Sequence, residues 1–234
     1  MALTGIDARL LPSPLADVQL WCIDLDQPLP DAGRTVLSPD EQARAQRFRF
    51  ARDRRRFEVG RVALRQLLAS RLGTAPAAVV LSSIGHGKPV LAPVSGALHF
   101  NLSHSAGFAL VAISPTAAVG IDVEGVGELA DAAGLAQEHF SAAEHAEWLS
   151  LPQPQRARAF LRGWTRKEAC LKAWGIGLSM SPRQVEVGIA PLPRWVAAPH
   201  PCLGGPLQLA SLAVPDNDGL EAAVALGTAG GPGE

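Results

Sequence analysis

The sequence predicts an α+β protein built from two similar halves. Short apolar segments typical of strands alternate with two pairs of helices, each pair a short helix followed by a long one. Each short helix opens with a Ser-x-x-Glu capping box, at residues 38–41 in the first pair and 141–144 in the second. The long helix of each pair contains a glycine 22 positions after that serine. Matched helix pairs at matched spacing indicate two halves, residues 1–115 and 116–234.

The first half begins with a strand over residues 18–25, in the apolar stretch VQLWCIDL. Ser38 is the expected N-cap of the short helix, and a proline follows in its first turn. A strongly basic second helix runs from about Asp53 to Arg71, and Gly73 ends it. Three short strands follow around Gly- and Pro-rich turns, at 79–84, 97–102 and 108–113.

The second half begins with a strand over residues 119–124. Its long helix runs from about Gln155 to Trp174 and ends in the stretch GIG. Two final strands are expected at 207–214 and 221–226. Cys170 falls inside the long helix, where we expect it to be packed in the core.

The composition indicates a globular protein and excludes several other classes. Of 234 residues, 47% are hydrophobic and 18% are charged, which is enough to bury a sizeable core. The net charge of −1 argues against a general nucleic-acid binder or a membrane-surface protein, and no apolar stretch approaches a membrane span. The N-terminus lacks the pattern of a signal peptide. The widely spaced Cys22, Cys170 and Cys202 fit reduced thiols in the cytoplasm better than a disulfide frame or a zinc site.

Two carboxylates interrupt the apolar strand VGIDVE. Side chains alternate along a strand, so Asp122 and Glu124 share one face while Ile121 and Val123 share the other. A bare Asp-x-Glu pair usually marks a solvated strand edge. The alternative is a magnesium site, because two carboxylates at this distance repel unless a cation lies between them, and Mg²⁺ takes carboxylate oxygens and often binds substrate phosphates as well.

A second group of residues lies on the long helix of the second half. Trp164, Glu168 and Lys172 are spaced four apart and therefore share one stripe of the helix. An ordinary Glu–Lys surface pair would explain two of them. The tryptophan indicates instead that this face is partly buried, where an idle ion pair gains little over its desolvation cost. If the helix packs across the Asp122 strand, Glu168 supplies a third oxygen ligand and Lys172 lies beside a bound phosphate.

The first half supplies groups suited to an anion. Lys88 stands between a glycine and a proline in GHGKPV, although the stretch is no P-loop. FNLSHS places Asn101, Ser103 and His104 at the end of a strand, although a lone histidine is more often structural. Seven arginines within 13 positions form a basic run, which is mostly solvated surface but suggests an anionic ligand or partner nearby: Arg44, Arg47, Arg49, Arg52, Arg54, Arg55 and Arg56.

Together these stretches resemble the surfactin-type 4′-phosphopantetheinyl transferase family. The resemblance runs from LSPDEQARAQRFRFARDRR through GKPVL, FNLSHS and VGIDVE to FSAAE and WTRKEACLKAWGIGL, and so covers nearly the whole chain. It implies a pseudo-dimer of two α+β halves, active as a monomer, with coenzyme A in the cleft between them. The implied reaction is Mg²⁺-dependent transfer of the phosphopantetheine arm of coenzyme A to a serine of an apo-carrier protein, an acyl or peptidyl carrier. Adenosine 3′,5′-bisphosphate is the other product.

The resemblance also assigns roles to individual residues. Asp122, Glu124 and Glu168 match the family's magnesium ligands, Glu168 also matches its proposed general base, and Lys172 matches the lysine that neutralises the pyrophosphate. The expected coenzyme contacts are Arg44, Arg52, Lys88, Asn101, Ser103, His104 and Lys172. One departure is Glu41, which stands where some relatives have a lysine near the nucleotide phosphate, and which puts the details of 3′-phosphate binding in doubt.

Two other classes remain as alternatives. A phosphohydrolase could use the same metal and phosphate groups with water as its nucleophile, and would act on coenzyme A without any carrier. A non-catalytic coenzyme-A-binding module would keep Lys88 and His104 but could lose Glu168. The residues leave open which carrier is the acceptor, whether acyl-coenzyme A serves as donor, whether Glu124 binds the metal directly, and whether Glu168 acts directly or through a water.

Overall fold

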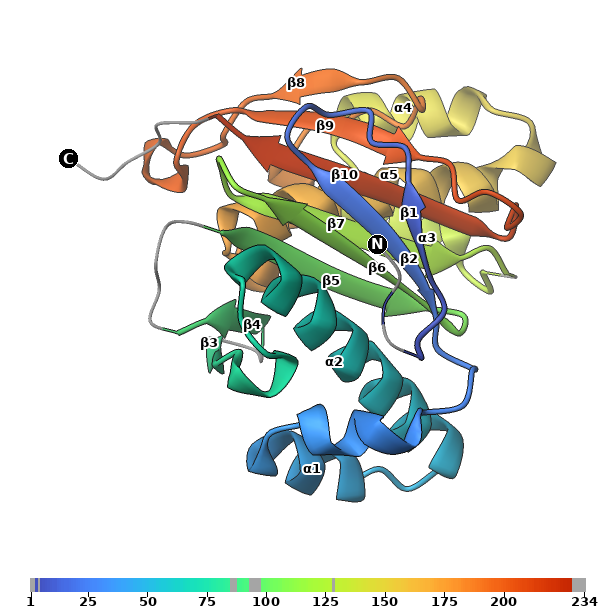
Figure 1. Ribbon diagram of the computed structural model, residues 1–234. Coiled ribbons are helices and arrows are strands. Elements are labelled where there is room, and N and C mark those ends of the chain that lie inside the picture. The colour runs from blue at the N-terminus through green and yellow to red at the C-terminus, as the bar shows by residue number, and fades with distance from the viewer. Residues whose placement is uncertain (1–2, 4, 85–87, 93–97, 128, 229–234) are drawn as a thin grey trace.

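The fold combines two antiparallel sheets with helices on their outer faces, as the sequence predicts for an α+β protein (Figure 1). The computed structural model describes residues 3, 5–84, 88–92, 98–127 and 129–228. No helix in this described part of the chain is long and apolar enough to cross a membrane.

The strands form two four-stranded sheets and one separate hairpin. The first sheet has the order β1 (Ala8–Leu11), β2 (Gln19–Asp24), β6 (Phe108–Ser114), β5 (His99–Ser105). The second has the order β7 (Val119–Gly125), β10 (Leu220–Gly227), β9 (Leu207–Leu212), β8 (Arg194–Val196). The hairpin pairs β3 (Leu81–Ile84) with β4 (Lys88–Leu91).

Both predicted helix pairs are present. They are α1 (Pro39–Gln46) with α2 (Ala51–Leu72), and α4 (Ala142–Ser150) with α5 (Gln153–Trp174). Both capping boxes form, with the serine hydroxyl accepting from the glutamate N–H and the glutamate side chain accepting from the serine N–H. Gly73 and Gly175 end the long helices in the left-handed conformation, which glycine adopts without steric penalty.

The two sheets have matching connectivity. In the first, α1 and α2 separate β2 from β5, and the strands lie in the order β2-β6-β5. In the second, α4 and α5 separate β7 from β9, and the strands lie in the order β7-β10-β9. All neighbouring strands are antiparallel. Each sheet comes entirely from one side of residues 115–118.

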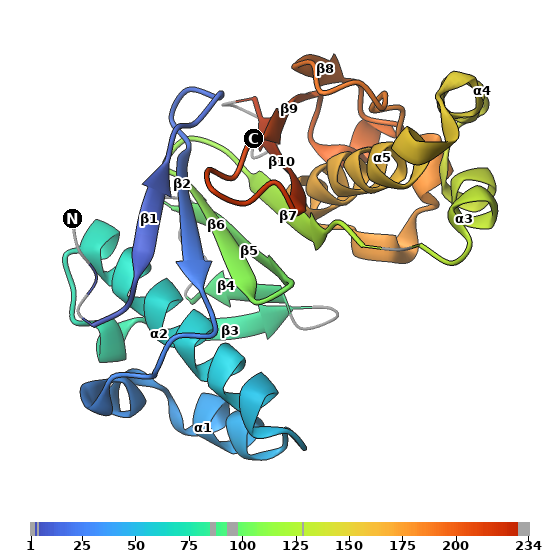
Figure 2. The ribbon, with the colours of Figure 1, turned by 90° about the vertical axis from the view of Figure 1, so that its right-hand side faces the viewer.

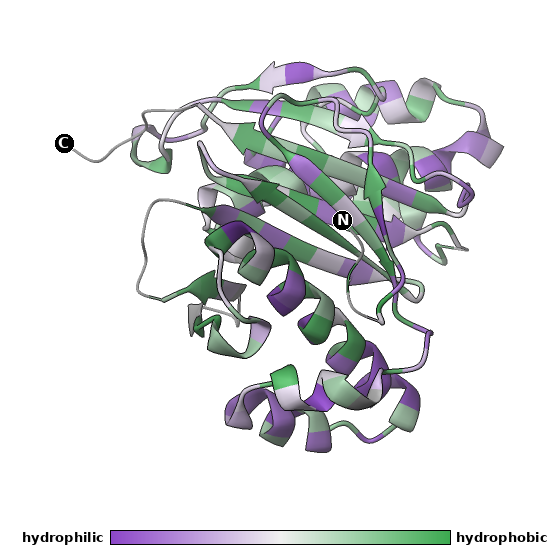
Figure 3. Cartoon of the chain, viewed as in Figure 1, coloured by the Kyte–Doolittle hydropathy of each residue, from purple (hydrophilic) through white to green (hydrophobic). Residues whose placement is uncertain are grey.

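Both faces of the central strands are buried. Along β2, Leu20 and Cys22 pack into a core between the two sheets, while Trp21 and Ile23 pack toward α2. β10 alternates in the same way between the inter-sheet core and the core under α5. Figure 2 shows the two sheets side by side with α2 and α5 on their outer sides, and Figure 3 shows hydrophobic colour concentrated on the strands. Burial of both faces explains why these strands are apolar over most of their length.

Several elements depart from the sequence prediction. The strands β1, β4 and β8 and the helix α3 (Ala132–His139) were not expected. Each is short, so none carries a long periodic pattern. The buried Cys170 in α5 confirms its expected packing, and all three cysteines are free, with only Cys202 exposed.

Candidate functional site

The two sheets meet at their edge strands, β5 and β7, and side chains bridge this junction. The Ser103 hydroxyl donates to Asp122 Oδ1 at 2.8 Å, and the Ser105 hydroxyl donates to Glu124 Oε2 at 3.0 Å. Ile121 and Val123 point into the inter-sheet core instead. The predicted separation of acids from apolar residues along this strand is therefore confirmed.

Asn101 extends the same row of contacts. Its Oδ1 accepts a hydrogen bond from the Ile121 N–H at 2.9 Å, and its side chain is buried. An unpaired edge-strand N–H would be costly when buried, and the asparagine satisfies it. Asn101 lines the cavity described below, but its observed contact joins the two sheets.

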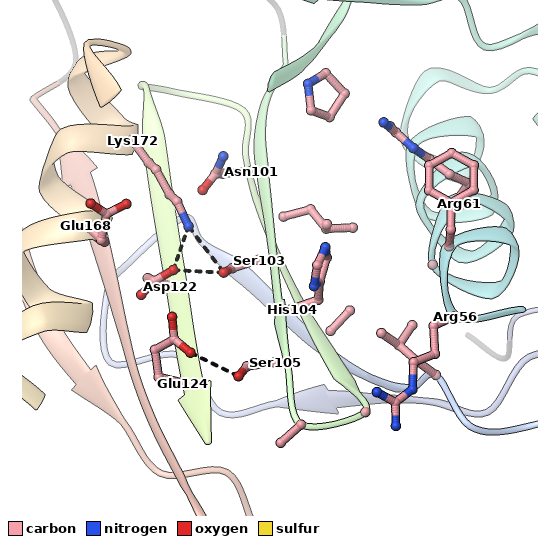
Figure 4. A pocket seen from close by; sticks show the side chains of 18 of the residues that line it. Arg56, Arg61, Asn101, Ser103, His104, Ser105, Asp122, Glu124, Glu168 and Lys172 are labelled. Carbon is pink, nitrogen blue, oxygen red and sulfur yellow. Dashed lines mark hydrogen bonds and ion pairs between the residues drawn. The ribbon is translucent and has the colours of Figure 1, made fainter. Parts of the chain in front are cut away.

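α5 crosses β7 at Gly120, as the sequence argument anticipated. A Cβ atom on Gly120 would lie 2.0 Å from the Ala169 carbonyl oxygen and 2.5 Å from the Ala173 nitrogen. The helix can approach this closely only because residue 120 has no side chain. The approach brings Glu168 and Lys172, which flank the crossing along α5, over the acids of β7 (Figure 4).

Lys172 contacts the buried acid directly. Its Nζ donates to Asp122 Oδ1 at 2.6 Å and to the Ser103 hydroxyl at 3.2 Å. The lysine side chain is 24% exposed and the aspartate side chain 5%. Within α5, the predicted stripe of Trp164, Glu168 and Lys172 is half-buried throughout and lines one cavity.

Burial raises the pKa values of all three carboxylates. Burial raises the pKa of Asp122, although Lys172 and Ser103 oppose the rise. Burial and the Asp122 charge raise the pKa of both Glu124 and Glu168. Asp122 Oδ2 and Glu168 Oε1 are buried without a hydrogen-bond partner among the described residues. The cluster therefore holds more negative charge than its contacts compensate.

The donor chemistry of this cluster fits a hard cation. Carboxylate oxygens are the ligands that Mg²⁺ prefers, and two of them here lack any other partner. In the structure as it stands, however, no group of three or more His, Cys, Asp or Glu side chains in the described ranges is arranged to hold a metal ion. The ammonium of Lys172 instead lies against Asp122.

A cavity of about 1010 Å³ opens beside the cluster and is lined from both halves of the chain. The carboxylates, Trp164 and Lys172 line it from β7 and α5, while Ser103 and His104 line it from β5. On the side of α1 and α2, the lining includes three arginines and two phenylalanines: Arg44, Phe48, Arg56, Phe57 and Arg61. One wall is thus cationic and the other mainly anionic.

The cationic wall is built around Phe57. The guanidinium carbon of Arg44 lies 5.3 Å from the Phe57 ring centre, and that of Arg61 lies 5.5 Å from it. Arg56 is held by Asp26 through bonds of 2.8 Å from Nε and 2.6 Å from an Nη. These contacts fix the arginines at the cavity rather than leaving them free in solvent.

His104 is an exposed residue near the end of β5 and lines the cavity. Desolvation lowers the pKa of its imidazole, and the nearby Lys172, Arg44 and Arg56 lower it further. A site with this much positive charge around an imidazole favours an anionic ligand.

Glu41 has a structural role. Besides closing the capping box, its Oε2 accepts a bond of 2.7 Å from Arg65, which is buried. Glu41 is not among the described residues that line the cavity. The departure at this position therefore does not place an acid in the candidate site.

The structure does not gather every predicted residue. Arg52 has a side chain 63% exposed, contacts Asp53, and is not among the described residues that line the cavity. Lys88 begins β4, but its side chain lies outside the described residues.

Sequence reasoning also missed contributors to this cavity. Ser105 alternates with Ser103 on the same strand face, and that period-2 signal could have revealed it. Arg61 stands one helical turn after Phe57, and that spacing could have paired them. Nothing in the sequence indicated that this face of α2 borders a cavity.

A cavity with arginines on one wall and with carboxylates and a lysine on the other is typical of an enzyme that acts on a phosphate ester. The sequence model of the "4'-phosphopantetheinyl transferase superfamily" matches residues 118–202, and that of "4'-phosphopantetheinyl transferase, N-terminal" matches residues 31–116. The chain belongs to the 4′-phosphopantetheinyl transferase family, and its enzyme class is phosphopantetheinyl transfer.

Curated relatives from distant organisms share this similarity. The chain is 42% identical over 180 residues to the 4′-phosphopantetheinyl transferase HetI of Nostoc sp., covering 75% of each chain. It is 34% identical over 170 residues to the 4′-phosphopantetheinyl transferase psf-1 of Bacillus pumilus, covering 69% of this chain and 71% of the relative. It is 30% identical over 193 residues to the human L-aminoadipate-semialdehyde dehydrogenase-phosphopantetheinyl transferase, covering 74% of this chain and 60% of the relative.

Proposed function

We propose that the chain is a surfactin-type enzyme that transfers the 4′-phosphopantetheine arm of coenzyme A to a serine of an apo-acyl or peptidyl carrier protein. The reaction requires Mg²⁺ and leaves adenosine 3′,5′-bisphosphate. The observation that carries this proposal is the Asp122–Lys172 contact, flanked by Glu124 and Glu168 and facing three arginines across one cavity. Such a site can hold a polyphosphate ligand by both ends.

In this proposal, the chain is a pseudo-dimer of two similar halves, and the active site lies between them. Matching strand orders and matching capping boxes support two similar halves, which we place at residues 1–115 and 116–234. The cavity supports the intervening cleft, since its lining comes from both. We also propose that the enzyme acts as a cytoplasmic monomer with no nucleic-acid or membrane partner, which rests on its free cysteines and near-neutral charge.

Asp122, Glu124 and Glu168 would hold the magnesium ion. The unpartnered Asp122 Oδ2 and Glu168 Oε1 support this assignment, because a bound cation would satisfy both. When bound, Mg²⁺ offsets the charge of the pyrophosphate oxygens and makes the phosphorus a better electrophile.

The chain's own residues then manage protons and charge. Glu168 removes the proton of the carrier serine, and its raised pKa makes it a stronger base. The serine oxygen bonds to the phosphorus of the phosphopantetheine arm as the bond to the departing bisphosphate breaks. Lys172 stabilises the charge that develops on that leaving group. Ser103 orients the Asp122 carboxylate through its hydrogen bond.

The cationic wall would bind the nucleotide end of coenzyme A. Arg44 and Arg61 stand at the cavity beside Phe57, and His104 faces the same space from β5. Family resemblance alone supports the coenzyme contact expected of Lys88. Arg52 is exposed and is not among the described residues that line the cavity, so we assign its expected coenzyme contact to Arg56, which lines it.

Mass spectrometry on a panel of apo-carriers incubated with the enzyme, Mg²⁺ and coenzyme A tests the proposal. At least one carrier should gain about one phosphopantetheine, roughly 340 Da from the chemistry of the transferred arm. A folded enzyme that modifies no carrier in a broad panel would refute the transferase function. Release of phosphopantetheine from coenzyme A without a carrier would identify a hydrolase instead.

A further inference from the structure

Exposed cations gather where α1 meets α2, beside the cavity-lining Phe48 and Asp53. Seven of the chain's 21 Lys and Arg residues fall within positions 44–56, alongside one acid, although the whole chain has a net charge of −1. Only Arg44 and Arg56 of these seven line the cavity. The coenzyme site therefore leaves the other five arginines unexplained.

The five differ in how far their charge is already compensated. Arg54 and Arg55 lie 3.1 and 3.6 Å from acidic partners. Arg52 contacts a neighbouring aspartate but keeps a side chain 63% exposed. Arg47 and Arg49 are exposed, and neither forms an ion pair within the described part of the chain. Arg47, Arg49 and Arg52 are therefore the cations most available to a partner.

Helix periodicity places these cations next to the cavity. Arg47 follows the cavity-lining Arg44 by three positions and still has helical backbone angles, so it lies on the same side of α1. Arg52 precedes the cavity-lining Arg56 by four positions and shares its face of α2. Arg47 and Arg52 also stand next in sequence to Phe48 and Asp53, which line the cavity.

An apolar side chain accompanies the cations. Phe50, in the connection between α1 and α2, is 58% exposed, and the Arg49 guanidinium carbon lies 5.4 Å from its ring centre. We call Arg47, Arg49, Phe50 and Arg52 the arginine rim. A surface that combines exposed arginine with an exposed aromatic ring is typical of protein-binding sites.

We propose that the arginine rim docks an acidic surface of the apo-carrier protein, with Phe50 contacting an apolar side chain of that surface. The inference rests on the proposed function, because a protein acceptor must cover the mouth of the cavity to bring its serine to the phosphate. Charge complementarity selects an acidic partner. The rim would steer the carrier toward the mouth and hold it in register, so it acts on carrier recognition and not on chemistry.

Single charge reversals test this assignment. In Arg47→Glu and Arg49→Glu, the KM for the best carrier of the panel should rise about tenfold at low ionic strength, while kcat and the KM for coenzyme A stay within about twofold. Arg71→Glu is the matched control: it makes the same charge change on an exposed residue at the other end of α2, and its carrier KM should not change. Added salt should raise the carrier KM of the wild-type enzyme more than it raises the carrier KM of the reversed variants.

A carrier in which one surface acid is replaced by lysine should rescue the reversed variants. An unchanged carrier KM in folded, active Arg47→Glu and Arg49→Glu would overturn the docking surface while leaving the transferase function intact. A matching rise in the KM for coenzyme A would overturn it too, by assigning the rim to the coenzyme. Relief of duplex-DNA inhibition in the variants, with carrier kinetics unchanged, would assign the rim to nucleic acid instead. Absence of transfer by the wild type would mark failure of the proposed function itself.

Discussion

The helix pairs of the two halves share a framework but present different sets of charges to the cavity. In each, the capping-box glutamate reaches a cation on the following long helix, Arg65 at 2.7 Å from Glu41 and Lys167 at 2.6 Å from Glu144. Beyond this shared contact, α2 presents two arginines and Asp53 to the cavity, while α5 presents Glu168 and Lys172.

This difference separates structural from functional positions. The contact that joins the two helices of each pair is a glutamate–cation pair in both halves. The residue directly after the repeated glycine is Arg61 in one half and Trp164 in the other, and both line the cavity. The glutamate of a capping box, by contrast, faces inward in both. One framework therefore supports two cavity walls that differ in charge.

The largest expected effect comes from neutralising the acidic wall. Glu168→Gln should lower kcat about a thousandfold, within the range for loss of a general base. Its melting temperature without Mg²⁺ should stay equal or rise, because Glu168 is buried beside Asp122 and its pKa is already raised by burial and by that charge. Kinetics and thermal melts with and without Mg²⁺ measure both effects.

Mg²⁺ should stabilise the wild type more than Glu168→Gln if the acid is a ligand. Glu147→Gln, an exposed position on α4, is the control and should behave as wild type. Ready unfolding of Glu168→Gln would show that the residue is structural.

The next largest effect comes from breaking the buried ion pair that joins α4 to α5. Lys167→Met leaves Glu144 buried without its cation, and removing one partner of a buried pair costs about 3–5 kcal/mol. Arg65→Met should cost less, because Glu41 is 11% exposed against 2% for Glu144, and Arg61 remains 3.9 Å from it. Urea denaturation of the two variants measures the difference, and equal losses would contradict it.

The same pair predicts a pH dependence. Burial raises the pKa of Glu144, but Lys167 and two backbone N–H groups lower it more, so the net shift is downward. The ionised Glu144 therefore stabilises the folded state fully above the ordinary glutamate pKa of 4.5. This stabilisation is lost as the pH falls through the lower pKa that Glu144 has in the folded protein. Lys167→Met should lose this contribution.

The smallest effect tests the cationic wall. Arg44→Ala should reduce the preference for coenzyme A over dephospho-coenzyme A by roughly tenfold, since an exposed, charge-assisted contact with the 3′-phosphate is worth about 1.4 kcal/mol. The measurement is kcat/KM for both donors at fixed ionic strength, with Arg71→Ala as control. Equal losses for both donors would place Arg44 away from the nucleotide phosphate.

Local sequence patterns predicted most of the helix ends and the alternation of side chains along the strand that carries Asp122. The capping boxes, the glycine stops and the alternation of Asp122 with Ile121 all follow from neighbouring residues, and the structure confirms them. The stripe on α5 was predictable for the same reason. Its packing against the acids of β7 was only a condition of the sequence analysis, and the Lys172–Asp122 contact now shows that packing.

The remaining features depend on contacts distant in sequence. Ser105 gains its role because β5 and β7 are edges of different sheets that meet, which no local pattern encodes. Arg61 stands near Glu41 and Phe57 through the packing of two helices. Arg52 is exposed although Arg56, four positions later on α2, lines the cavity, and a run of arginines does not reveal where along the helix the cavity lies.

The close crossing at Gly120 limits how this sequence can change over evolution. A single added methyl group there would meet the Ala169 carbonyl oxygen at 2.0 Å, and backbone cannot rotate aside as a side chain can. The helix would have to shift, and Glu168 and Lys172 would move together because they stand on it. Gly120 therefore constrains the sequence through the space that it leaves for the helix, without contributing a side chain of its own.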